Sequence, residues 1–398
     1  MKTDKLPLSL YIHIPFCKKK CLYCDFLSAP ACWREREDYV KALLREISVM
    51  AKSCEEYRII SVFFGGGTPS LLSSLQMKRI MAAIRKGYHL CEDAEITVEC
   101  NPATADLQKL AAFRDLGINR LSIGLQSAND KELKELGRIH NYRQFLETFD
   151  AARKAGFTNI NVDIMSALPG QTYESYMHTL ASVVALQPEH VSAYSLIIEE
   201  GTPFYERYAV DCREQKEVAQ TMEYAPMYLP LPDEDTERRM YHGTVKFLQG
   251  EGYVRYEISN YAKKGYECRH NMTYWTGIEY LGLGLGAASY FKGCRYKNTS
   301  DMELYLQNAT EKIIEEELVL TAEDKMEEYM FLGLRLKKGV SIGLFENLFR
   351  VPMDTIYGKE IEKMKTEGLL LQRGDKLRLS KKGTDVANYV MSHFILDK

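Results

Sequence analysis

The chain has 398 residues, of which 45% are hydrophobic and 27% charged, and its formal net charge is −3. That length allows one large domain and a smaller one, and the near-neutral charge gives no electrostatic basis for binding nucleic acid. No run of about 18 apolar residues suggests a membrane span, and no signal peptide is evident. The ten cysteines are too thinly spread for a disulfide framework, so we expect a reduced, cytoplasmic protein.

Six short apolar or β-branched runs alternate with amphipathic stretches in the first half of the chain. This alternation predicts parallel strands joined by helices with right-handed crossovers. The predicted strands are 8–14, 59–64, 96–99, 120–125, 159–164 and 191–196, and the predicted helices are 38–50, 75–86, 105–116, 142–155 and 173–186. Six units are too few for a closed eight-fold barrel. We therefore predict an α/β fold with a partial, open parallel (β/α)6 barrel, whose functional residues lie at the carboxyl ends of the strands.

Changes in composition divide the chain into three predicted parts. Residues 1–232 form the barrel, and the prolines at 226, 230 and 232 mark its end. Residues 233–310 form a flanking segment rich in tyrosine and glycine. Residues 311–398 read as helices plus a hairpin that turns at Gly374-Asp375, which is typical of an α+β, winged-helix-like domain.

Three cysteines follow the first predicted strand, at Cys17, Cys21 and Cys24, in a C-x3-C-x2-C pattern. Three thiolates can hold three irons of a [4Fe–4S] cluster. The fourth iron is then free to chelate an amine and a carboxylate, which the methionine end of S-adenosylmethionine (SAM) provides. The alternative is a zinc site, which usually needs a fourth ligand, and His13 is the nearest candidate.

Polar or glycine-rich segments also follow the other predicted strands. The segment 65–69 could bring its backbone close to a ligand, or form a tight turn capped by Thr68. Carboxylates can bind ribose hydroxyls and an arginine can grip a carboxylate, so these groups are candidate SAM contacts. The alternatives are an exposed strand end for Glu99 and a solvated helix end for Arg138. The candidates are Glu99, Gln126, Arg138 and Asp163.

A histidine and two aromatic residues stand together in the string His270-Asn-Met-Thr-Tyr274-Trp275. Such a histidine could ligate heme iron while the aromatic rings pack on the macrocycle. More often, a histidine in this setting is a hydrogen-bonded structural residue. The string alone leaves both interpretations open.

Taken together, these strings resemble the radical SAM family of oxygen-independent coproporphyrinogen III oxidase, and within it the HemW branch of heme chaperones. The resemblance runs from residue 8 into the carboxy-terminal domain. It is carried by residues 11–26, 65–72, 99–102, 121–127, 136–140, 168–172, 198–202, 256–260 and 270–275. The decarboxylase branch has a further cysteine where this chain has Phe26, and a longer segment before the cluster. The chaperone branch has the H-N-x-x-Y-W string.

The resemblance implies roles for individual residues. Cys17, Cys21 and Cys24 would ligate the cluster, and the heme contacts would come from His270, Tyr274 and Trp275. The residues implied for the SAM pocket are Tyr11, Tyr23, Gly66, Gly67, Thr68, Glu99, Gln126, Arg138, Asp163, Ile197 and Ala288. The chain departs from the family at two positions: Ala167 stands where glycine is usual, and Ala288 where the chaperone branch has histidine.

The hypothesis is a heme chaperone that binds a [4Fe–4S] cluster, SAM and heme, and delivers heme to an acceptor protein such as a membrane-bound respiratory component. An electron donor such as flavodoxin or ferredoxin is implied if SAM is cleaved. One alternative is an enzyme that oxidatively decarboxylates coproporphyrinogen III to protoporphyrinogen IX. A radical SAM heme methyltransferase and a plain zinc-binding scaffold are two further alternatives. We assign no catalytic residue from the sequence.

Overall fold

A computed structural model describes residues 5–208, 228–308 and 313–396, so Pro226 lies outside the described residues. Its main feature is a large curved sheet, in which twelve described strands follow the order β12-β11-β10-β9-β1-β2-β3-β4-β5-β6-β8-β7. The six central strands are mutually parallel, as predicted. They are β1 (Leu6–Ile14), β2 (Tyr57–Gly66), β3 (Leu90–Cys100), β4 (Arg120–Gln126), β5 (Ile160–Ser166) and β6 (His190–Ser195).

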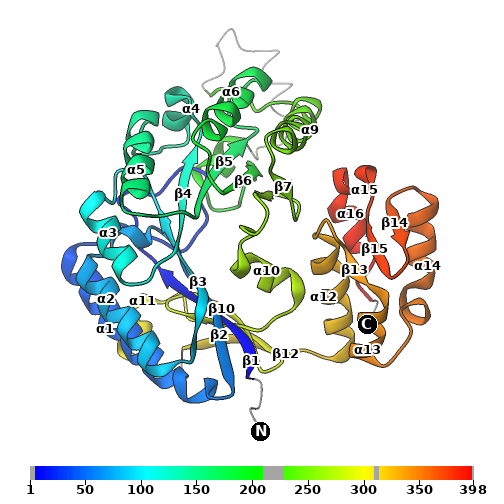
Figure 1. The fold of residues 1–398 in the computed structure, drawn as a ribbon, viewed down its shortest axis with the longest axis horizontal. Helices are drawn as coiled ribbons and strands as arrows, with labels where there is room; N and C mark the ends of the chain where they lie inside the picture. The colour runs from blue at the N-terminus through cyan, green and yellow to red at the C-terminus, as the bar shows by residue number, and fades with distance from the viewer. Residues whose placement is uncertain (1–4, 209–227, 309–312, 397–398) are drawn as a thin grey trace.

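Helices cover the convex face of this sheet (Figure 1). The amphipathic stretches form them because their apolar side chains pack on the strands while their polar sides face water. Gly117 and Gly156 follow two of these helices with φ of 86° and 88°, the left-handed conformation in which a glycine commonly ends a helix. The helices are α1 (Trp33–Met50), α2 (Ser74–Gly87), α3 (Leu107–Asp115), α4 (Asp130–Glu135), α5 (Tyr142–Lys154), α6 (Tyr173–Val184) and α9 (Glu234–Gly250).

The barrel is open, as predicted, because other strands extend both edges of its parallel part. Strand β9 (Tyr280–Leu283) pairs in parallel with β1, and β8 (Asn260–Ala262) pairs antiparallel with β6. The remaining strands of the sheet are β7 (Val254–Arg255), β10 (Ala288–Phe291), β11 (Cys294–Asn298) and β12 (Ile314–Val319). The other elements of this part are α7 (Pro203–Tyr208), α11 (Met302–Asn308) and the short helices η1 (Ala51–Cys54) and η2 (Pro69–Leu71).

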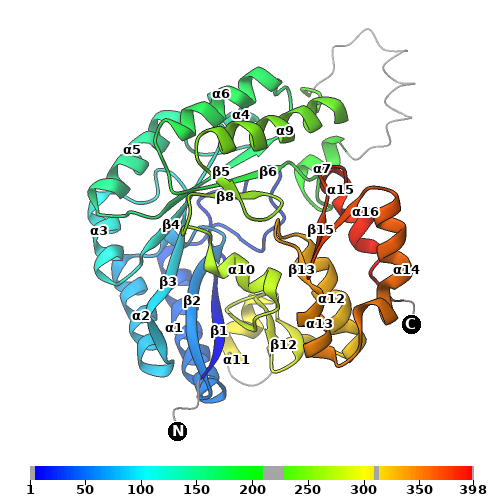
Figure 2. The ribbon, with the colours of Figure 1, turned by 45° about the vertical axis from the view of Figure 1, so that its right-hand side comes forward.

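Helix α10 (Arg269–Thr276) lies on the concave face of the sheet, opposite α1 and α2 (Figure 2). Ser9 of β1 shares a hydrogen bond of 2.8 Å with Thr273, and Ser61 of β2 shares one of 2.9 Å with His270. Because side chains alternate along a strand, these serines face α10 while Leu8 faces the opposite, helix-covered side. Polar side chains of β1 and β2 therefore hold α10 against the concave face.

The carboxy-terminal domain has its own buried core, which includes Met330, Phe345, Tyr357 and Leu377. Its helix–strand–helix–helix–hairpin order is that of a winged helix, as the sequence predicted. The hairpin turns at Gly374, whose φ is 54°. The elements are α12 (Ala322–Leu334), β13 (Val340–Ser341), α13 (Ile342–Phe349), α14 (Met353–Thr366), β14 (Leu370–Arg373), β15 (Lys376–Leu379), α15 (Lys381–Asp385) and α16 (Ala387–Ser392).

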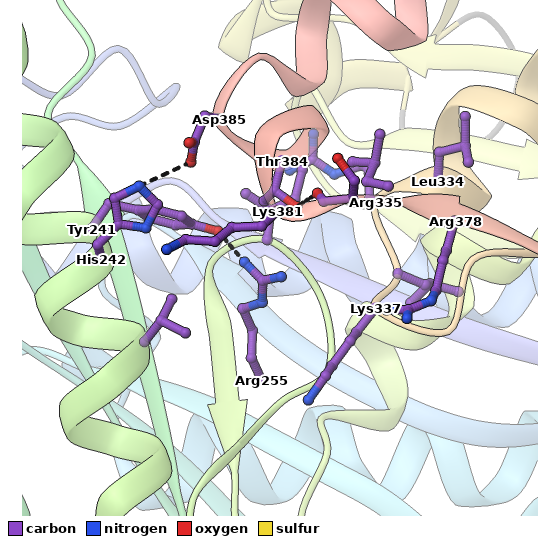
Figure 3. A pocket seen from close by; sticks show the side chains of 15 residues that line it. Tyr241, His242, Arg255, Leu334, Arg335, Lys337, Arg378, Lys381, Thr384 and Asp385 are labelled. Atoms are coloured by element: carbon purple, nitrogen blue, oxygen red, sulfur yellow. Dashed lines mark hydrogen bonds and ion pairs between the residues drawn. The ribbon is translucent and has the colours of Figure 1, made fainter. Parts of the chain in front are cut away.

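Polar contacts hold this domain against the barrel around a pocket of about 220 Å³ (Figure 3). The Nε2 atom of His242 on α9 lies 3.3 Å from Oδ1 of Asp385 on α15. The backbone N–H of Lys337 donates to the carbonyl of Tyr256 at 3.0 Å. These contacts place the far end of the chain beside the concave face of the sheet. Among the helices of the described ranges, none has both the length and the apolar character needed to cross a membrane.

The backbone is strained at Ala167, where the resemblance implies that glycine is usual, and this strain gives a test of the fold. Ala167 has φ of 59°, in the left-handed region, which costs an L-residue about 1–2 kcal/mol. Ala167→Gly removes that cost but loses one buried methyl group, worth roughly 0.8 kcal/mol. We expect the variant to be more stable by up to about 1 kcal/mol in denaturant titration. Ala185→Gly is the control. Because Ala185 has φ of −58°, an ordinary helical value, this variant should be less stable than the wild type.

Candidate cofactor site at the strand ends

The cysteine loop between β1 and α1 is pinned to the body of the protein by backbone hydrogen bonds. The N–H of Cys17 donates to the carbonyl of Ala29 at 3.0 Å, and the N–H of Leu22 donates to the carbonyl of Leu136 at 3.1 Å. The thiols of Cys17, Cys21 and Cys24 are free and half-buried. The loop therefore holds three free sulfur ligands at the carboxyl end of β1.

The surroundings of these thiols suit a bound cationic centre. Burial, together with the neighbouring Cys21 and Cys17, raises the pKa of the Cys24 thiol to about 11. A bound cationic centre would offset this cost of ionisation. Across the described part of the chain, no three His, Cys, Asp or Glu side chains gather as ligands of one metal ion would. Cluster thiolates each bind a different iron, so they need not converge on one point.

The glycine segment at the end of β2 packs directly against the end of β1. A Cβ on Gly66, whose φ is 107°, would lie 2.4 Å from the His13 ring, and one on Gly67 would lie 2.6 Å from the Phe16 carbonyl oxygen. The Thr68 hydroxyl makes no helix cap and instead lies 3.5 Å from Sγ of Cys17. The glycines thus serve a close approach between two protein segments. That approach brings the segment to the cysteines.

Arg138 joins three of the predicted segments. Its Nη1 lies 3.5 Å from Sγ of Cys21, and its Nη2 donates to Oδ1 of Asn101 at 2.9 Å and to the carbonyl of Gly124 at 2.7 Å. Its Nε is buried and has no partner among the described residues. A buried, unpaired donor on a guanidinium beside the cysteine loop suits the carboxylate of an amino acid. Tyr23 lies beside the same guanidinium, and burial raises the pKa of its phenol.

Two acids lie together, Glu99 near the end of β3 and Asp163 in the middle of β5. Burial, with Asp163 nearby, raises the pKa of Glu99 to about 8, although the N–H of Gly66 donates to its Oε2 at 3.1 Å. Asp163 accepts hydrogen bonds from Asn161 at 2.7 Å and from Ser122 at 3.2 Å, and burial raises its pKa as well. Glu99 is therefore largely protonated at neutral pH and can donate a hydrogen bond to a ligand hydroxyl.

The other predicted SAM residues lie in strands of the large sheet or directly after them. Gln126 ends β4 with φ of 74°, a strained conformation that is common at functional sites. The hydroxyl of Tyr11 shares a hydrogen bond of 3.1 Å with Nδ1 of His13. Ala288 is exposed at the start of β10, and Ile197 follows β6 with its side chain 66% exposed. The SAM contacts of these last two residues stay predictions.

Helix α10 places His270 in the interior of the barrel. The ring is 1% exposed, and it stacks on Phe63 at 5.0 Å between centroids. Its Nδ1 shares a hydrogen bond of 2.9 Å with Ser61, and its Nε2 shares one of 2.9 Å with the Tyr274 hydroxyl. Burial, with the charge of Arg120, lowers the pKa of His270 to about 3, so the ring is neutral. Both nitrogens are occupied, and an iron would have to displace one of these partners.

Arg120 is an interior residue that the sequence analysis missed. Its side chain is 1% exposed, and its charge acts on Asp163, Glu99 and His270. Its Nε is buried without a partner among the described residues. The only local signal is a charged residue at the start of a buried strand, and such residues are usually exposed.

These features define the class of the protein. Residues 11–183 match the Radical SAM superfamily, and residues 320–386 match the HemN C-terminal domain. The open barrel and the cysteine loop agree with that match, so the protein is a radical SAM protein. The superfamily implies a [4Fe–4S] cluster and SAM as cofactors, and the free thiols and the unpaired Nε of Arg138 fit them.

Full-length relatives identify the family more narrowly. The heme chaperone HemW of Lactococcus lactis subsp. lactis (strain IL1403) is 37% identical over 98% of this chain and 98% of its own length. That of Bacillus subtilis (strain 168) is 34% identical over 97% and 99%. The chain belongs to the heme chaperone HemW family. The structure of coproporphyrinogen III oxidase (HemN) from Escherichia coli matches with a TM-score of 0.83, at 24% identity over 98% of this chain and 90% of that one, which shows a common fold.

Replacing Cys21 tests the cluster ligands. Cys21→Ala removes one of three thiolates, so we expect anaerobically reconstituted protein to lose most of its cluster iron and visible absorbance. Cys91→Ala is the matched control, because Cys91 is also a free, half-buried thiol but lies at the start of β3. Iron and sulfide analysis of both variants provides the measurement. Equal cluster content in the two would remove Cys21 from the site.

The raised pKa of Glu99 predicts how stability depends on pH. The folded pKa of about 8 exceeds the ordinary value of 4.5, so the folded protein holds this proton more tightly than the unfolded chain. The contribution of Glu99 to stability is complete below pH 4.5 and is lost as pH rises towards 8. We expect Glu99→Gln to gain thermal stability over the wild type across this window. Asp163→Asn removes the neighbouring charge and should move this pH window to lower values. If the melting temperatures of Glu99→Gln and the wild type changed in parallel with pH, the raised pKa of Glu99 would be contradicted.

Proposed function

We propose that the protein binds heme and passes it to an acceptor protein. The observation that carries the proposal is the full-length similarity, at 37% and 34% identity, to two proteins named heme chaperones. The H-N-x-x-Y-W string that marks the chaperone branch supports it, because the string forms α10, beside the cofactor site. The acceptor would be a protein such as a membrane-bound respiratory component, and we propose that the chaperone itself works in the cytoplasm.

In this proposal Cys17, Cys21 and Cys24 hold the [4Fe–4S] cluster. When bound, the cluster and SAM supply one-electron chemistry, with flavodoxin or ferredoxin as the donor. Arg138 offsets the thiolate charge and offers Nε to the SAM carboxylate. Glu99 donates its proton in a hydrogen bond to a ribose hydroxyl. The full proposed SAM pocket is Tyr11, Tyr23, Gly66, Gly67, Thr68, Glu99, Gln126, Arg138, Asp163, Ile197 and Ala288.

We also propose a division of labour along the chain. Residues 1–232 carry the cluster and SAM, residues 233–310 carry α10, and residues 311–398 form the carboxy-terminal domain. Strand β12 links the last two parts, because it pairs with β11 in the large sheet and leads into α12.

The competing function is decarboxylation of coproporphyrinogen III. We consider this function because the protein shares its fold with coproporphyrinogen III oxidase. The position where the decarboxylase branch has a further cysteine is occupied by Phe26, which is 58% exposed here and offers no thiol. This observation favours the chaperone.

A pair of measurements decides between the two functions. We expect wild-type protein with its cluster to bind heme at one equivalent in a Soret titration. We expect no protoporphyrinogen after anaerobic incubation with coproporphyrinogen III, SAM and a reductant. Clear protoporphyrinogen production would overturn the proposal, and so would the absence of heme binding.

The role of His270 has its own test. We propose that His270 ligates the iron once Tyr274 releases Nε2. We then expect His270→Ala to lose or blue-shift the Soret band. Tyr274→Phe, which frees Nε2, should bind heme at least as tightly as the wild type. An unchanged spectrum and affinity in His270→Ala would remove His270 from the heme site without touching the proposal that heme is bound.

A further inference from the structure

A cleft of about 570 Å³ separates α10 and β10 from the carboxy-terminal domain. This volume falls within the range of about 300–1,000 Å³ that is usual for small-molecule sites. Trp275 and Tyr290 line the cleft from the side of the large sheet. Tyr329 of α12 and Leu344 and Leu348 of α13 line it from the domain. The cleft lies at the carboxyl end of α10, whose other end holds the buried His270.

Helix α13 presents an apolar surface to this cleft. Leu344 is 50% exposed and Leu348 is 58% exposed, and the two lie one helical turn apart. Aromatic rings of Trp275, Tyr290 and Tyr329 stand around the same space. A large, flat, apolar ligand would remove this surface from water, which is the main source of affinity in such sites.

The charges around the cleft are basic. Lys325, Lys338 and Lys376 line it, and none of the salt bridges found in the described ranges involves these lysines. The one acidic lining residue, Glu328, is already paired with Arg295, whose Nη2 lies 2.9 Å from its Oε2. The cleft thus combines an apolar interior with unpaired positive charge. That combination suits an apolar ligand that carries carboxylates.

A row of rings connects the cleft with the interior of the barrel. The centroids of His270 and Tyr274 are 5.2 Å apart, those of Tyr274 and Tyr280 are 4.7 Å apart, and those of Tyr280 and Tyr290 are 6.5 Å apart. Tyr290 lines the cleft, so a ligand there would sit at the end of this row. The cleft and the cofactor side of the sheet are therefore in continuous contact through aromatic packing.

We propose that this cleft holds the heme macrocycle, with Trp275 and Tyr290 on one side and α13 on the other, and with the two propionates directed to the lysines. The inference rests on the proposed function, because it takes heme as the ligand. His270 lies at the opposite end of the row of rings, so the cleft is where the macrocycle docks before His270 can ligate its iron. It assigns the carboxy-terminal domain a direct part in heme binding.

A charge placed in the cleft tests the inference. Because Leu344 is half exposed, Leu344→Glu should fold, and its far-UV spectrum and cluster content verify this. We expect the variant to bind heme roughly tenfold more weakly than the wild type in Soret titration. Leu371→Glu is the matched control, since Leu371 is 41% exposed in the same domain but does not line the cleft. The control should bind heme as the wild type does.

The lysines have a separate test. We expect the wild type to prefer heme to its dimethyl ester, because only free propionates can pair with the lysines. The triple variant Lys325→Ala, Lys338→Ala, Lys376→Ala should lose this preference. Retention of the full preference would overturn the assignment of the propionates.

The outcomes separate this inference from the proposed function. Wild-type protein that binds no heme would contradict both. Wild-type protein that binds heme, together with a Leu344→Glu variant of equal affinity, would contradict the cleft alone. A Leu344→Glu variant that binds heme as the wild type does but no longer transfers it to an acceptor would also contradict the heme cleft. That result would assign the cleft to binding of the acceptor protein.

Discussion

The contact between the ends of β1 and β2 is the constraint on which the rest of the site depends. Two backbone hydrogen bonds join these segments, from Gly67 N–H to the Ile14 carbonyl at 2.9 Å and from Thr68 N–H to the Phe16 carbonyl at 2.7 Å. Only residues without a Cβ fit at Gly66 and Gly67. The contact fixes the start of the cysteine loop and sets the Thr68 hydroxyl beside Cys17. Side chains from neighbouring strands then meet the loop from a defined direction.

The barrel interior contains acidic side chains that are costly to ionise, with a buried arginine near them. Glu99 and Asp163 both have raised pKa values because they are buried together, and Arg120 limits that cost without removing it. The same arginine helps to keep His270 neutral. An interior of this kind favours hydrogen bonds from neutral groups to a polar ligand. It also leaves Arg138, next to the cysteines, as a partner for a ligand carboxylate.

Helix α10 connects the barrel interior with the cleft beside the carboxy-terminal domain. Its first turn is tied to the sheet through Glu95, which accepts from the N–H groups of Arg269 and His270 at 3.1 Å each. Its last turn carries Trp275, over which the Arg335 guanidinium of the carboxy-terminal domain lies at 4.5 Å from the ring centroid. One short helix therefore contacts the barrel interior at one end and the second domain at the other.

The sequence by itself determined the features that arise from local patterns. Alternating apolar runs predicted the six parallel strands and their helices, the spacing of Cys17, Cys21 and Cys24 predicted the ligand loop, and Gly374-Asp375 predicted the hairpin. Only the tertiary structure decided that Arg120 is buried, that His270 has both nitrogens occupied, and that Trp275 lines a cleft shared with α13. Local patterns follow from the short-range geometry of helices and strands. Ser61, a hydrogen-bond partner of His270, lies 209 positions away along the chain. The residues around His270 carry no pattern that indicates which distant segment the fold brings near.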